Sequence, residues 1–132
     1  MEKSTWELTW REPGNATPVR TADELDHLVR SLIGERDGDL PILIMLTAPD
    51  AKWMSIGLAE PSVATFQSGV DPPYFVSAGS PSSDRKPLLF SFQGHWTEFE
   101  AEAAIPLDDA LQALRAFLIS AERPTNIEWA ET

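Results

Sequence analysis

The chain contains no cysteine and only two histidines among its 132 residues. Without cysteine it can form neither a disulfide nor a thiolate zinc or iron–sulfur site, and thiol catalysis is excluded as well. The histidines, His27 and His95, are far apart in sequence and follow no metal-ligand spacing. We therefore expect no cofactor, no metal site built on cysteine or histidine, and no catalytic residue of these two types.

Long apolar runs are also missing. The longest, Ile42–Leu46 after Pro41, is far shorter than the roughly 20 residues that a bilayer span requires. The N-terminus MEKSTWELTW has no apolar segment of the kind found in signal peptides. Phosphate-binding glycine loops and a Gly-x-Ser-x-Gly nucleophile turn are absent too. These absences predict a cytoplasmic protein with no membrane partner.

Positive charge is scarce, because 10 Lys and Arg residues stand against 21 Asp and Glu residues, for a net charge of −11. Such a chain repels a phosphate backbone, so we expect no direct binding of nucleic acid. Two interpretations of the acidity stay open. It can serve solubility alone, or it can complement a basic partner and speed the encounter with it.

Apolar periodicity indicates the fold. Residues 21–33 and the stretch from Pro106 to Arg123 carry apolar side chains at helical spacing, and a capping box runs from Thr21 to Glu24. Strand patterns cover residues 4–10, 41–47, 53–59, 62–67, 86–102 and 125–129. Residues 11–18 and 71–86 are predicted to be loops. This order predicts one α+β domain over residues 1–132, with two helices packed on a mostly antiparallel twisted sheet.

The stretch Lys86–Glu102 is predicted to be a hairpin that turns at Gln93-Gly94. On its returning strand, period-two alternation puts four residues on one face: Trp96, Glu98, Glu100 and Glu102. A face that aligns three carboxylates beside a tryptophan must lie in water or against something cationic. The exposed segment 71–86 is a further candidate for recognition, and from it we select Asp71, Tyr74 and Asp84 as contact residues.

Other uses of the carboxylates stay open at this point. Clustered Asp and Glu residues can serve a small-molecule-binding or hydrolytic domain. A divalent cation at Glu98, Glu100 and Glu102 is conceivable, although alternate residues of a strand lie roughly 7 Å apart and form no closed cage. An exposed sheet edge could instead pair with a second copy of the chain, giving a homodimer.

Three stretches, taken in order, resemble the first numbered family of immunity proteins from bacterial polymorphic toxin systems. They are Trp53–Ala59 with its Ser-Ile-Gly-Leu, Thr97-Glu98-Phe99 followed by Ile105-Pro106 and the Ala110…Ala113…Phe117 pattern, and Arg123–Trp129. The likeness runs from the Thr21 helix to Trp129. Where that family usually has a proline soon after Thr-Glu-Phe, this chain has Glu100.

The resemblance implies an α+β protein that binds and neutralises a cognate toxin and has no catalytic residues of its own. Relatives are often encoded beside deaminase toxins. The positions Gly57, Phe117, Pro124 and Trp129 match the family pattern and are expected to be architectural. Because the binding surface differs between members, the contacts must be inferred from charge and exposure, which favour the tryptophan and glutamates of the predicted strand face together with Asp71, Tyr74 and Asp84.

Overall fold

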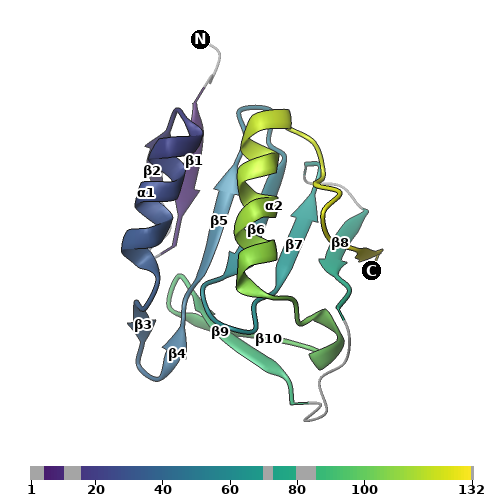
Figure 1. The fold of residues 1–132 in the computed structure, drawn as a ribbon. Coiled ribbons are helices and arrows are strands. Elements are labelled where there is room, and N and C mark those ends of the chain that lie inside the picture. The colour runs from purple at the N-terminus through teal and green to yellow at the C-terminus, as the bar shows by residue number, and fades with distance from the viewer. Residues whose placement is uncertain (1–4, 11–15, 70–72, 80–85, 132) are drawn as a thin grey trace.

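The computed structural model describes residues 5–10, 16–69, 73–79 and 86–131. Its main feature is a seven-stranded antiparallel sheet in the order β11-β8-β7-β6-β5-β1-β2, with α1 and α2 on one face (Figure 1). Its strands are β1 (Trp6–Thr9), β2 (Ala16–Val19), β5 (Leu43–Thr47), β6 (Trp53–Gly57), β7 (Ala64–Gln67), β8 (Tyr74–Ser77) and β11 (Trp129–Glu131). The other elements are α1 (Ala22–Leu32), β3 (Arg36–Asp37), β4 (Leu40–Pro41), β9 (Leu88–Phe92), β10 (His95–Phe99), η1 (Ala101–Ala103) and α2 (Leu107–Ser120). The predicted α+β class is confirmed.

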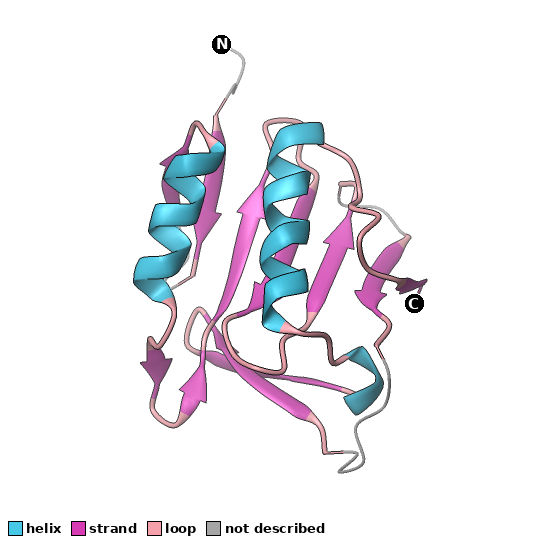
Figure 2. Cartoon of the chain, in the orientation of Figure 1, coloured by secondary structure: helices cyan, strands magenta, loops and turns pink. Residues whose placement is uncertain are grey.

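One face of the sheet, which we call the helix face, is covered by both helices (Figure 2). Alternation along the central strands sends Ile44, Ile56 and Phe66 to this side, where all three are buried. The ring of Phe117 on α2 is fully buried at the centre and meets two other rings edge-on, with centroid distances of 4.9 Å to Trp6 and 5.4 Å to Phe66. The main core therefore lies between this face and the helices.

Both helices begin at side chains that satisfy their first backbone donors. The Thr21 hydroxyl accepts from the Glu24 amide at 3.0 Å, and the Glu24 carboxylate accepts from the Arg20 amide at 3.1 Å. The predicted capping box is thus confirmed, with the carboxylate reaching one residue beyond the cap. The first amide of α2, on Leu107, donates to the Glu60 carboxylate at 2.7 Å. This long-range cap fixes α2 to the loop after β6.

On the opposite face, the hairpin face, the described residues cover one end, where the β9–β10 hairpin crosses the sheet (Figure 1). Phe90 on β9 lies directly on Gly57 of β6, and a Cβ at this glycine would overlap the ring. Leu43 and Val63 pack against Phe90 and complete a second, smaller core. The absence of a side chain at Gly57 therefore permits the close approach of β9 to β6.

Two of the predicted loops contain strands. Ala16–Val19, which overlaps the end of the segment 11–18, is the edge strand β2, where the exposed Pro18 removes no hydrogen bond from the sheet interior. Tyr74–Ser77, within the segment 71–86, is β8 and lies between β7 and β11. The Ser77 hydroxyl accepts from the Ala64 amide at 3.0 Å and donates to the Ala103 carbonyl at 2.6 Å. The contacts of β8 with β11 and with Ala103 join segments distant in sequence, so short local patterns did not reveal this strand.

Candidate functional site

The predicted strand face of one tryptophan and three glutamates is broken in the structure. That prediction is wrong because β10 ends at Phe99, which leaves only Trp96 and Glu98 on the strand. The chain then turns into the 3-10 helix η1, and the Ala103 amide donates to the Glu100 carbonyl at 2.9 Å. The first and last alanines of η1 are buried, which their small apolar side chains tolerate. Glu102, in the middle of η1, is therefore no longer aligned with Trp96 and Glu98 of β10.

The three glutamates nevertheless line one concave surface, which we call the acidic hollow. Glu98, Glu100 and Glu102 all line it, all three are exposed, and its volume is about 350 Å³. The other lining residues are Val76, Ser77, Ala78, Phe99, Ala103 and Ala130. No lysine or arginine is present among these described lining residues. The hollow is therefore a solvated site of negative potential.

A second concave surface, the aromatic hollow, lies over the part of the hairpin face that β9 and β10 leave uncovered. Its volume is about 460 Å³, and the rings of Trp53 and Tyr74 stand in it with centroids 5.9 Å apart and planes inclined by 45°. Its other lining residues are Leu43, Met45, Ser55, Thr65, Val76, Phe92, Thr97, Glu98 and Phe99. Val76, Glu98 and Phe99 line both hollows, so the two form one continuous surface.

The polar groups on the floor of the aromatic hollow bind one another. The hydroxyls of Ser55 and Thr65, which face each other across β6 and β7, share a short hydrogen bond. The side chain of Tyr74 is also hydrogen-bonded to Thr65, and burial raises the pKa of its phenol above the usual value of 10.0, partly offset by that bond. At neutral pH the floor is therefore uncharged, and Glu98 contributes the negative charge at its border.

The remaining predicted contact residues are distributed differently. Trp96 is 67% exposed on the outer side of the hairpin, opposite Ser91, and lines neither hollow. Asp71 and Asp84 lie outside the described residues. Sequence reasoning missed Trp53 as a site residue, although its alternation with Ser55 and Gly57 marked a side of β6 with small residues. Small neighbours are what leave room for a hollow beside an aromatic ring.

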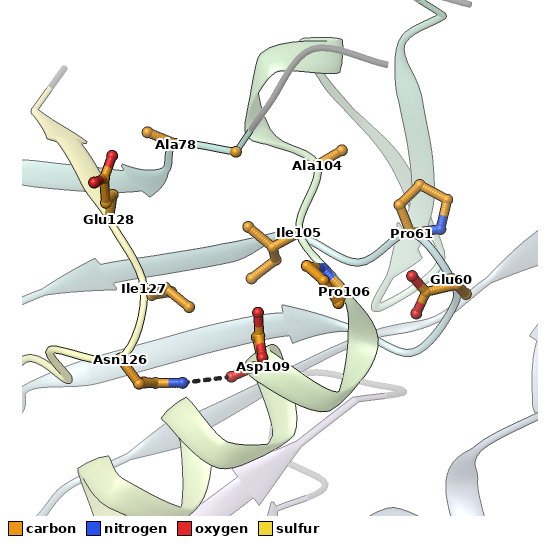
Figure 3. A pocket seen from close by; sticks show the side chains of 11 residues that line it. Glu60, Pro61, Ala78, Ala104, Ile105, Pro106, Asp109, Asn126, Ile127 and Glu128 are labelled. Atoms are coloured by element: carbon orange, nitrogen blue, oxygen red, sulfur yellow. Dashed lines mark hydrogen bonds between the residues drawn. The ribbon is translucent and has the colours of Figure 1, made fainter. Parts of the chain in front are cut away.

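A third hollow, of about 660 Å³, lies at the N-terminus of α2 and is lined by Glu60, Asp109 and Glu128 among others. Figure 3 shows these carboxylates around Ile105. Glu60 caps α2, and the Asn126 side-chain amide donates to the Asp109 carbonyl at 3.0 Å. These contacts hold the helix start against the C-terminal segment, so we assign this hollow an architectural role.

The family-matched positions also have structural contacts. Phe117 is at the centre of the main core, and Gly57 lies beneath Phe90. The indole of Trp129 donates to the Pro124 carbonyl at 2.8 Å, which fixes the segment before β11. All four positions that the family pattern marks as architectural therefore have a packing or hydrogen-bonding reason.

Within the ranges that the structure describes, no three His, Asp or Glu side chains come together as a possible metal site. In the same ranges, neither helix has the length and apolar character needed to span a bilayer.

Comparison with protein families gives one informative match, and it agrees with the resemblance read from the sequence. The model of the family described as immunity protein Imm1 matches residues 13–131, which is nearly the whole chain. A search of curated protein sequences finds no match. The family match implies binding of a cognate toxin protein and suggests a non-catalytic role. The chain belongs to the Imm1 family of immunity proteins.

Proposed function

We propose that this Imm1 protein neutralises a toxin domain that acts on nucleic acid, a deaminase, by occupying the cationic groove in which the toxin binds its substrate. The observation that carries the proposal is the acidic hollow, which Glu98, Glu100 and Glu102 all line although the strand that was expected to align them ends early. A nucleic-acid enzyme presents positive charge to the phosphate backbone and admits a base into a pocket. Carboxylates placed in that groove compete directly with the substrate.

The rest of the surface supports the same proposal. A net charge of −11 favours fast encounter with a cationic partner. The exposed Trp96 and the half-buried Tyr74 lie on either side of the hairpin, and aromatic side chains are frequent anchors in protein interfaces. We include both residues, together with Asp71 and Asp84, in the proposed contact set.

The alternative, a small-molecule-binding or hydrolytic domain that uses clustered carboxylates, has less support. Acid–base catalysis by a carboxyl pair needs one group whose pKa is raised, which requires a site that excludes water. Glu98, Glu100 and Glu102 are all exposed around an open hollow. This geometry favours binding through charge over chemistry on an enclosed substrate.

The proposal is tested by co-expressing the chain with the toxin domain encoded beside its gene. We expect growth to be restored, a stoichiometric complex to purify, and deamination of a single-stranded nucleic acid by the toxin to stop. Added nucleic acid should slow formation of the complex, because both ligands occupy the same groove. Continued killing by the toxin contradicts the immunity role here. Rescue from a toxin without deaminase activity contradicts only the choice of toxin class.

A further inference from the structure

The aromatic hollow is the part of the hairpin face that nothing in the described chain covers, and its chemistry is specific. The rings of Trp53 and Tyr74 supply electron-rich faces. The hydroxyls of the floor are hydrogen-bonded to one another, so they do not require a polar ligand. Glu98 stands at the border that the aromatic and acidic hollows share.

The charge of the lining favours a cation. Among the described residues that form the two joined hollows, the acidic side chains are the three glutamates, and none is a lysine or arginine. Aromatic faces beside a carboxylate suit a guanidinium best, because this group is planar, weakly hydrated and able to form a forked pair with a carboxylate. The chain already has a contact between a guanidinium and an aromatic ring elsewhere, where the Arg123 guanidinium lies 4.1 Å from the centre of the Phe75 ring.

We propose that the aromatic hollow accepts an arginine side chain of the toxin, with the guanidinium against Trp53 and Tyr74 and paired with Glu98. A lysine ammonium would fit less well, because it keeps its water more strongly and cannot form the forked pair. The identity of the partner rests on the proposed function, whereas the arginine site itself can be tested on this chain alone. In the complex, this arginine would lie beside the positive groove that the acidic hollow faces.

The test is an NMR titration of the full chain with acetyl-arginine amide, and with acetyl-lysine amide and acetyl-leucine amide as comparison probes. The Trp53 indole resonance is assigned by its loss in the Trp53→Phe variant. We expect the arginine probe to shift this resonance saturably and to bind roughly threefold more tightly than the lysine probe. Equal responses to all three probes, or shifts confined to other residues, would overturn the arginine site.

The contribution of Glu98 is measured with Glu98→Gln, which keeps the shape and removes the charge. Binding of acetyl-arginine amide should weaken roughly fivefold, as expected for loss of one exposed charge pair. The matched control, Asp108→Asn on α2, removes the same charge from the other side of the molecule and should bind as the unchanged chain does. Unchanged binding by Glu98→Gln contradicts the proposed pairing.

Toxin neutralisation by the same variants separates the two proposals. A chain that neutralises its toxin but does not bind acetyl-arginine amide disproves the arginine site and leaves the proposed function intact. A chain that binds the arginine probe at Trp53 but protects against no toxin supports the site and contradicts the proposed function.

Discussion

The two faces of the seven-stranded sheet differ in how fully they are covered. On the helix face, α1 and α2 bury a continuous apolar core, and a salt bridge between Asp26 and Arg115 links the two helices. On the hairpin face, a single β-hairpin buries a small core around Phe90 and leaves Trp53 and Tyr74 in an open hollow. Both faces are built by the same strands. The comparison indicates that the helix face provides stability and that the open part of the hairpin face is available for recognition.

The largest effect of a substitution on stability is expected on the helix face. Phe117→Ala should lower the free energy of unfolding by about 3–5 kcal/mol, because it removes a fully buried ring and leaves a cavity between Trp6 and Phe66. Urea denaturation followed by tryptophan fluorescence measures the change. The matched substitution on the hairpin side is Trp96→Ala, where the ring is 67% exposed, and it should change stability by less than about 0.5 kcal/mol. Similar losses in both variants would contradict the division of roles.

The contact between the hairpin and the sheet can be tested at Gly57. Gly57→Ala should cost about 1–3 kcal/mol, because the new methyl group overlaps the ring of Phe90. In the double variant with Phe90→Ala, the loss in free energy of unfolding should be smaller than the sum of the losses in the two single variants, because the clash has been removed. Simple additivity in a double-mutant cycle would mean that the ring is not what limits the space at Gly57.

The charge of the acidic hollow should govern the rate of association with the toxin. Glu98→Lys combined with Glu100→Lys is expected to lower the association rate constant about tenfold at low salt and to weaken its salt dependence. The control combines Asp23→Lys with Asp108→Lys, exposed positions on the two helices, and so changes net charge by the same amount. Stopped-flow mixing with the toxin domain measures both. Equal slowing by the two variants would attribute the effect to overall charge and not to this surface.

The smallest effect concerns Tyr74, which is the only tyrosine in the chain. Because burial raises its pKa above 10.0 in the folded state, its contribution to stability is present below the unfolded pKa and is lost as pH rises through the folded pKa. Phenolate absorbance should therefore titrate at higher pH in the folded chain than in denaturant. Tyr74→Phe should remove this part of the alkaline loss of stability. Coincident titrations in the two states would contradict the burial of the phenol.

Local patterns predicted much of the fold. The Thr21 capping box, the apolar stripes of the two helices and the turn at Gln93-Gly94 are all confirmed. Each depends on residues near one another in sequence or on a backbone geometry that only certain residues adopt. At the turn, both Gln93 and Gly94 have positive φ, as a tight hairpin requires.

The missed features depend on distant partners. β8 is short, and its place in the sheet becomes evident only when β7 and β11 lie on either side of it. The end of β10 depends on the burial of two alanines in η1. The alternation of glutamates continues to Glu102, so the sequence predicts a longer strand. The acidic hollow is therefore only partly foreseeable: its glutamates were selected from the sequence, whereas their arrangement and the adjoining Trp53 were not.

Alternation along β10 has a consequence for how such proteins diversify. Thr97 and Phe99 line the aromatic hollow, whereas the Trp96 ring extends outward into solvent. A change at the outward position carries almost no folding penalty, so mutation can sample new side chains there while the scaffold persists. A lineage whose toxins drift in sequence could then alter its specificity one side chain at a time, and the helices on the far side of the sheet would be unaffected.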